Sequence, residues 1–177
     1  MLKEMLSRKP GRTIVIAVDE GPVSKEALEW SMDKIISKED TIKLVTVVDP
    51  AERPTFVTPG GVPIEADPNN CAPDPKQQEK RNKILNDFRD TLEKQLKGIN
   101  CSTDSLVSCL GSSGDQGRHI CEFAAENKAD MIVLGSRGMG SFRRSIMGMF
   151  GLGSVSSYVV NHATVPNIII HKHQECQ

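Results

Sequence analysis

The amino-acid sequence predicts an α/β fold: a single domain with a doubly wound, five-stranded parallel sheet and helices on both faces. Short apolar, β-branched runs recur along the 177 residues, and the first of them, residues 13–18, contains no polar residue after Thr13. Such runs are typical of strands that are buried on both faces. Amphipathic segments of helical spacing separate the runs, and this alternation favours right-handed crossovers in a parallel sheet.

The first half of the chain is expected to supply two strands and a helix, followed by a long loop. Ser24 is expected to cap an amphipathic helix that ends near Ser37. Residues 42–48 form the second predicted strand, which stops at Asp49-Pro50 because proline cannot continue a ladder. Residues 50–75 then contain seven prolines and few apolar residues. This composition favours disorder or a passive loop over a lid, because little apolar surface is present to hold a lid closed.

The second half is expected to alternate helices with three further strands. Its predicted elements are a helix over 76–97, a strand over 105–110, a turn over 111–117, a helix over 118–128, a strand over 131–135, a helix that begins at Ser154 and a strand over 165–170. We expect residues 13–172 to form the domain, with polar tails at 1–12 and 173–177.

A glycine-rich segment follows the strand predicted at residues 131–135. Glycines at the end of a buried strand allow backbone N–H groups to approach an anion closely. Ser154 is expected to cap the next helix, whose N–H groups and positive dipole end would face the same corner. Residues 131–170 contain three arginines and no Asp or Glu, so the local field favours an anion. The segment therefore predicts a phosphate-binding corner.

The predicted topology places a binding crevice at the same corner. In a doubly wound sheet, ligands bind beyond the carboxyl ends of the strands, where the strand order reverses. Asp19, residues 47–49 and the stretch from Gly135 onward all follow predicted strands. We expect them to line this crevice together.

Composition argues against several partners. The chain has 22 Lys and Arg against 23 Asp and Glu, a net charge of −1, which gives no basic face for nucleic acid. No apolar stretch is long enough to cross a bilayer and the amino end has no leader-like apolar core, so we expect a cytoplasmic protein without a membrane partner. The five cysteines form no C-x-x-C pair and predict neither a disulfide framework nor a zinc site.

Two common nucleotide signatures do not fit. The P-loop pattern is missing because the chain has no Gly-Lys pair. The dinucleotide fingerprint occurs only as fragments at Gly138-Met139-Gly140 and Gly151-Leu152-Gly153, and neither follows the first strand. A standard NTPase and an NAD enzyme are therefore both disfavoured.

From Thr13 to Lys172 the chain resembles the universal stress protein family. The resemblance rests on a first strand that ends in Asp19, a second that ends in Val47-Val48-Asp49, and Gly114-Asp115 before a helix. It continues with Ala129 to Gly138, Gly153-Ser154-Val155-Ser156, and Val165-Pro166 before the last strand. The resemblance implies a five-stranded parallel sheet, a homodimer formed through the last strand (166–170) and, in one branch, an ATP site with the pattern G-x-x-G-x9-G-[ST].

The resemblance also implies which residues bind the nucleotide. Asp19 would lie near the ribose and adenine, Ala17 and Val47 would offer backbone groups to the base, and the remainder would form the phosphate cradle. That cradle comprises Gly135, Arg137, Gly138, Gly140, Gly153, Ser154, Val155 and Ser156. Arg143 and Arg144 are open candidates for a phosphate contact. The alternative roles are a strand-end turn for Asp19 and tight strand-to-helix packing for the glycines.

One spacing departs from the family pattern. Fourteen residues separate Gly138 from Gly153, where the pattern has nine. Removing residues 149–153 would place Gly148 directly before Ser154 and restore the pattern, so we interpret this stretch as a five-residue insertion. The insertion either bulges outward or packs its apolar side chains over the site.

Two functions follow from these patterns. The first is a cytoplasmic, homodimeric switch or sensor that binds ATP, or AMP or ADP in its place, with magnesium. We find no metal site and no catalytic residue by spacing, including a general base for fast hydrolysis, so the chain is at most a slow ATPase. The alternative is a nucleotide-free dimeric interaction module in which the 149–153 insertion has altered the pocket.

Overall fold

The computed structural model describes residues 11–48, 56–57, 59–61, 63–64, 73–108, 113–136 and 153–171. Its elements are β1 (Thr13–Ala17), α2 (Pro22–Lys34), β2 (Thr41–Val48), β3 (Phe56–Val57), β4 (Pro63–Ile64), α3 (Pro75–Gln95), β5 (Asn100–Val107), α4 (Ser113–Glu126), β6 (Met131–Gly135), α5 (Ser154–His162) and β7 (Asn167–Ile170). Within these residues, no helix has the length and apolar character needed to cross a membrane.

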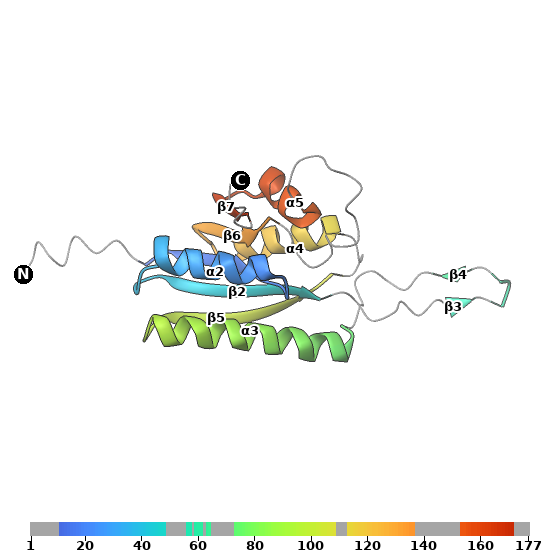
Figure 1. The fold of residues 1–177 in the computed structure, drawn as a ribbon. Coiled ribbons are helices and arrows are strands. Elements are labelled where there is room, and N and C mark those ends of the chain that lie inside the picture. The colour runs from blue at the N-terminus through green and yellow to red at the C-terminus, as the bar shows by residue number, and fades with distance from the viewer. Residues whose placement is uncertain are drawn as a thin grey trace, which may run out of the picture.

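Five parallel strands form the main sheet in the order β5-β2-β1-β6-β7 (Figure 1). The chain builds outward from β1 to β2 and β5, and then returns to the other side of β1 for β6 and β7. The strand order therefore reverses between β1 and β6, which makes their carboxyl ends the expected ligand site. The predicted doubly wound fold is confirmed.

Each face of the sheet carries its own apolar core. Ile14 and Ile16 of β1 pack in one cluster with Leu28 of α2 and Leu85 of α3. Val15 belongs to the cluster on the opposite face, together with Ile120 of α4 and Val159 of α5. Two helices thus cover each face, and this arrangement explains why the first strand has an unbroken apolar sequence.

The helix over Pro22–Lys34 begins earlier than predicted. Its N-cap is Gly21 and not Ser24, and no side chain caps it. Pro22 occupies the first helical position, where its missing N–H costs nothing and its fixed φ suits a helix. Ser24 lies inside the first turn and makes different contacts, which are described below.

Two other predicted boundaries were wrong by about five residues. The third strand of the main sheet is Asn100–Val107, where 105–110 was predicted, because its first half is polar. This strand is an edge of the sheet and is only half-buried, so it tolerates polar residues that a central strand would exclude. The predicted turn over 111–117 was also wrong from residue 113 onward, because α4 already begins at Ser113.

Gly117 lies inside α4 for a packing reason. A Cβ at this position would stand 2.7 Å from Tyr158 Cβ and 2.9 Å from the Tyr158 ring on α5. The glycine therefore allows α4 and α5 to pack closely, and it is not a turn residue. Pattern alone could not distinguish the two roles.

The predicted loop over residues 50–75 contains a short hairpin in its described part. Phe56 pairs with Ile64 and Val57 with Pro63, in antiparallel register. Gly61, in the connection, has a φ of +77°, a conformation that suits glycine. The predicted long loop thus carries a short hairpin in its described part.

Candidate functional site

The strand register brings the predicted site residues to one edge of the sheet. Ala17 of β1 is level with Val45 of β2 and Leu134 of β6. Two residues further along each strand are Asp19, Val47 and Ser136. The carboxyl ends of β1, β2 and β6 therefore present these positions side by side, at the point where the strand order reverses.

Asp19 shapes the turn between β1 and α2. Its Oδ1 accepts hydrogen bonds from the Gly21 N–H at 2.8 Å and from the Ser24 hydroxyl at 2.6 Å. The Asp19 N–H in turn donates to Ser24 Oγ at 3.0 Å. This reciprocal pair fixes the direction of the Asp19 side chain, which is the turn role considered from sequence, and it leaves Asp19 at the crevice.

The end of β6 is tied to the start of α5 through a single carbonyl group. The Ser136 carbonyl accepts from the Gly153 N–H and from the Ser156 hydroxyl, the latter at 2.9 Å. The Ser136 N–H donates to the Ile170 carbonyl of β7 at 2.7 Å. Ser156 is 2% exposed, and its hydroxyl also approaches the Gly153 carbonyl at 3.0 Å. In the described contacts Ser156 thus holds α5 in place.

The amino end of α5 faces this corner without a side-chain cap. Its N-cap is Gly153, so the expectation that Ser154 caps the helix was wrong, and Ser154 is the exposed first helical residue. No described residue accepts a hydrogen bond from the N–H groups of Ser154, Val155 or Ser156. Backbone N–H groups and the positive end of a helix dipole together suit an anion.

Gly135 lies where β6 meets α2. A Cβ on Gly135 would approach Val23 Cγ1 at 3.0 Å and Val23 Cβ at 3.3 Å. Contacts of this length are tight for any Cβ, so Gly135 lets the first turn of α2 approach the end of β6. The packing role considered from sequence applies at this position, and Gly135 also stands beside the crevice.

Several predicted site residues lie outside the described part of the chain. These are Arg137, Gly138, Gly140, Arg143 and Arg144, together with residues 149–152 of the proposed insertion. Of the predicted phosphate cradle, the structure describes Gly135, Gly153, Ser154, Val155 and Ser156.

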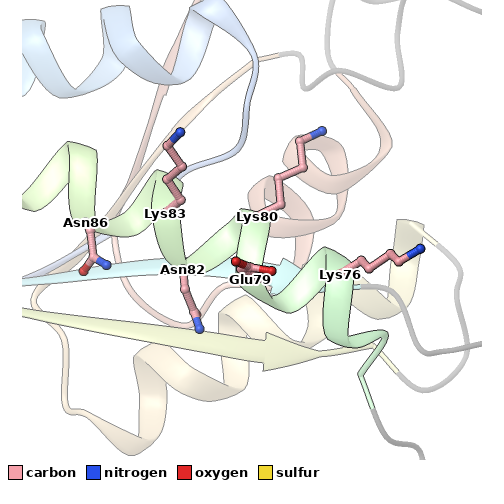
Figure 2. Close-up of a pocket in the computed structure, with 6 residues that line it drawn as sticks. All are labelled: Lys76, Glu79, Lys80, Asn82, Lys83 and Asn86. Atoms are coloured by element: carbon pink, nitrogen blue, oxygen red, sulfur yellow. The ribbon is translucent and has the colours of Figure 1, made fainter.

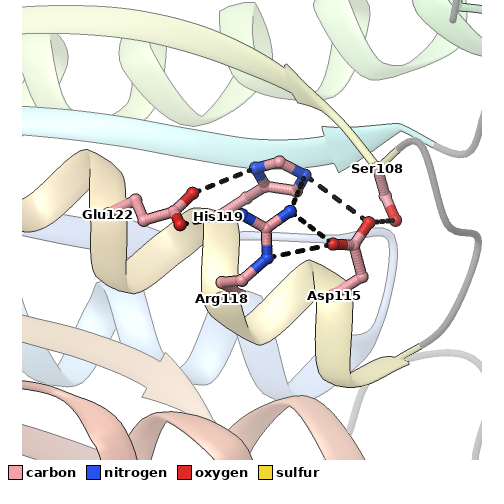
Figure 3. Close-up of polar contacts among 5 residues, drawn as sticks. All are labelled: Ser108, Asp115, Arg118, His119 and Glu122. Carbon is pink, nitrogen blue, oxygen red and sulfur yellow. Dashed lines mark hydrogen bonds and ion pairs between the residues drawn. The ribbon is translucent and has the colours of Figure 1, made fainter. Parts of the chain in front are cut away.

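A second polar cluster stands at the carboxyl end of β5 and was not singled out from sequence (Figure 3). Asp115 is 4% exposed; its Oδ2 accepts from the Ser108 hydroxyl at 2.7 Å and its Oδ1 from Arg118 Nη2 at 2.7 Å. Hydrogen bonds from Arg118 to Asp115 and Glu122 raise the pKa of that guanidinium. His119 lies between the two carboxylates, 3.5 Å from Asp115 and 3.6 Å from Glu122.

This cluster anchors α4 to β5. The buried Asp115 carboxylate receives a hydroxyl from the strand and a guanidinium from its own helix, so its charge is compensated. Sequence gave one signal for it, the Gly114-Asp115 pair before a helix. The partners Ser108 and Arg118 follow only from the three-dimensional arrangement.

Comparison with known proteins shows to which family the chain is related. The model of the universal stress protein family matches residues 11–171. The universal stress protein Sll1388 of Synechocystis sp. is 37% identical over 76 residues, which are 43% of this chain and 42% of that protein. The chain thus spans about two fifths of the length of the curated relative that it matches.

Solved structures share the fold at low identity. A universal stress protein in complex with cAMP has a TM-score of 0.58 at 20% identity, over 92% of this chain and 98% of that chain. The universal stress protein from Archaeoglobus fulgidus in complex with dAMP has a TM-score of 0.57 at 18% identity, over 92% and 99%. With the family match over nearly the whole chain, the protein belongs to the universal stress protein family.

Proposed function

We propose that this protein is a cytoplasmic, homodimeric switch or sensor that binds ATP, with AMP or ADP as alternative ligands, and hydrolyses it slowly or not at all. The observation that carries the proposal is the uncapped start of α5 at the strand-order reversal, opposite the turn that holds Asp19. A helix amino end with free N–H groups is a ready anion site. Two related structures contain adenine nucleotides, by their descriptions cAMP and dAMP.

The residues at the crevice suit the parts of such a ligand. The backbone N–H groups of Ser154, Val155 and Ser156 would hold phosphate oxygens, and Asp19 would hold ribose hydroxyls, as a strand-end carboxylate does in many nucleotide folds. Each charge-assisted hydrogen bond of this kind contributes about 1.5–3 kcal/mol. Magnesium would be held chiefly by the phosphates and water, which needs no dedicated protein cage.

The first test is isothermal titration of the intact chain with ATP and magnesium, beside a variant that lacks residues 149–153. Similar affinity in both chains would mean that the stretch leaves a working site. Binding by the shortened chain alone would support the alternative, a nucleotide-free module, which the Gly138 to Gly153 spacing favours. No binding by either chain at millimolar ATP would overturn the proposed nucleotide function.

A substitution at Gly138 tests the phosphate corner directly. Valine at this position would add a β-branched side chain beside the phosphate and disfavour positive φ. We expect Gly138→Val to lower ATP affinity strongly while the circular dichroism spectrum stays unchanged. A folded Gly138→Val chain with the affinity of the parent would contradict the assignment of this residue.

The dimer is proposed to form through residues 166–170. β7 is one edge of the five-stranded sheet, and Ile168, Ile169 and Ile170 on it are only half-buried. A short apolar edge strand is open to pairing with a second copy. Light scattering after size exclusion checks this; a monomer at all concentrations would remove the dimer from the proposal.

A further inference from the structure

Glu20 ties the Asp19 turn to α3. Its carboxylate is 2.7 Å from Lys80 Nζ through Oε2 and 3.8 Å from Arg81 Nη1 through Oε1. The Glu20 side chain is 16% exposed and that of Arg81 20%, whereas Lys80 is 61% exposed. Two of the three groups are thus largely shielded from water, where ion pairs are less screened by salt.

Arg81 keeps unused donor capacity at this contact. Its Nη1 is buried and has no hydrogen-bond partner, although Glu20 Oε1 stands 3.8 Å away. Unsatisfied buried polar atoms are rare in native proteins and ask for a physical reason. Here a small shift of the Glu20 turn toward α3 would turn the ion pair into a hydrogen bond.

The net positive charge of α3 lies in its first half. Its first half, residues 75–86, carries three lysines and one arginine against a single glutamate, whereas residues 87–95 carry two cations and three carboxylates. Cations near a helix amino end oppose the helix dipole, so local stability does not explain their placement. Figure 2 shows Lys80 and Lys83 extending to the same side of α3.

The hollow beside α3 is not itself a base-binding pocket. It measures about 560 Å³, and its described lining is Lys76, Glu79, Lys80, Asn82, Lys83 and Asn86 (Figure 2). None of these side chains is aromatic, so the hollow offers no ring on which a base could stack. The Lys80 contact with Glu20 instead connects this helix to the turn at the crevice.

We propose that Glu20, Lys80 and Arg81 are positioning residues for the nucleotide site. The two cations hold the neighbouring residue Glu20, while Ser24 and Gly21 hydrogen-bond to Asp19 itself. Asp19 is adjacent to Glu20 in the chain, so releasing Glu20 from α3 loosens the turn that aims the Asp19 carboxylate at the ribose. The inference rests on the proposed adenine-nucleotide function and adds to it the means by which α3 sets ribose recognition.

The test compares ATP with 2′,3′-dideoxy-ATP, which lacks both ribose hydroxyls that Asp19 could accept from. In the parent chain we expect ATP to bind more tightly than the dideoxy analogue. In Glu20→Gln, and in the double variant Lys80→Gln with Arg81→Gln, we expect ATP affinity to fall about five- to tenfold, and the preference over the analogue to shrink toward one. Affinity for the analogue should change little.

A double-mutant cycle separates positioning from other effects. If Glu20 acts through Asp19, adding Glu20→Gln to Asp19→Asn should cost no further ATP affinity. The matched control is Glu93→Gln, which breaks the 3.8 Å pair with Arg89 at the other end of α3 and should leave both affinities unchanged. Urea unfolding of each variant confirms that the chains compared are folded.

The outcomes are distinguishable. If the parent chain fails to bind ATP, the proposed function fails and the inference fails with it. If the parent binds ATP but Glu20→Gln keeps the full preference for ATP, or if its effect adds to that of Asp19→Asn, the positioning role is overturned and the nucleotide site stands.

Discussion

The two ends of the parallel sheet differ in how completely the described contacts satisfy their polar groups. At the amino-terminal end, the Asp40 carboxylate accepts from the Arg12 N–H, Nε and Nη2 and from the Ser37 N–H, at 2.7–3.2 Å. Arg12 Nη2 also donates to the Ile35 carbonyl at 2.7 Å. Asp40 is 2% exposed, so these contacts compensate a buried charge and join β1, α2 and β2.

At the carboxyl-terminal end, some donors have no acceptor among the described residues. No described residue accepts from the first three N–H groups of α5, and Arg81 Nη1 is buried without a hydrogen bond. Such groups lower the stability of the isolated chain and are retained where a ligand can use them. In the proposed function, the amino-terminal end of the sheet therefore contributes stability and the carboxyl-terminal end binds the ligand.

The largest effect should come from breaking the amino-terminal network. Asp40→Ala removes all the acceptors of this carboxylate and should lower the free energy of unfolding by about 3 kcal/mol. Nucleotide affinity of the folded fraction should not change, because the site lies at the other end of the strands. Urea unfolding and ATP titration measure the two quantities.

Asp33→Ala is the control for this change, because its pair with Lys34 is exposed and should contribute little. An Asp40→Ala chain as stable as the parent, or one that folds but loses ATP affinity, would break the division between the two ends.

The fold and the position of Asp19 could be predicted from sequence better than the roles of individual glycines and serines. The unbroken apolar run of β1 and the helical spacing around it predicted the doubly wound sheet, because burial on both faces restricts sequence strongly. The position of Asp19 at the strand-order reversal followed from topology. Gly117 was misread as a turn residue and Ser154 as a helix cap, since the same residue types serve packing and turns alike.

The contacts between distant segments could not be predicted from sequence. Glu20 and Lys80 are 60 residues apart, and Arg12 and Asp40 are 28 apart; both pairs are ordinary charged residues in the printed sequence. Only the fold brings each pair together. Periodicity reports which face of an element is buried, but it does not report which polar side chains meet across that face.

The close packing of Gly117 in α4 against Tyr158 in α5 allows a test of the proposed site at the start of α5. Gly117→Ala would place a Cβ 2.7 Å from Tyr158 Cβ, so α4 and α5 must separate. We expect a loss of about 2 kcal/mol in the free energy of unfolding. ATP affinity should fall as well, because α5 carries the N–H donors.

Glu126→Ala, at an exposed position of the same helix, is the control and should change neither quantity. Loss of stability with unchanged ATP affinity in Gly117→Ala would mean that the start of α5 is not part of the site.

Acid should weaken the amino-terminal end of the sheet. Burial pushes the pKa of Asp40 upward, but the hydrogen bonds from Arg12 and Ser37 outweigh it and hold the pKa below its usual range. A carboxyl group with a lowered folded-state pKa stabilises the fold above its unfolded pKa, near 3.9, and loses that stabilisation as pH falls through the folded value.

We therefore expect the parent to have a higher free energy of unfolding than Asp40→Asn. The difference should be constant above about pH 5 and should shrink below about pH 4. Urea unfolding across this range measures the difference. A difference that stays constant down to pH 3 would show that the Asp40 charge does not contribute.

The smallest effects separate two serines at the binding end. Ser156→Ala removes a buried hydroxyl that donates to the Ser136 carbonyl and should cost about 1 kcal/mol of stability. Ser154→Ala removes an exposed hydroxyl without a capping bond and should leave stability within about 0.5 kcal/mol of the parent. For Ser154, the expected change is in ATP affinity, weaker by about tenfold if the hydroxyl binds phosphate.

The two serines thus form an internal comparison within one helical turn. If Ser154→Ala lowers ATP affinity without a change in unfolding, the exposed hydroxyl contacts the ligand, and Ser156 supports it by fixing α5 to β6. If both variants lose affinity only in proportion to stability, the phosphate is held by backbone N–H groups alone, and the glycine that precedes them matters more than either hydroxyl.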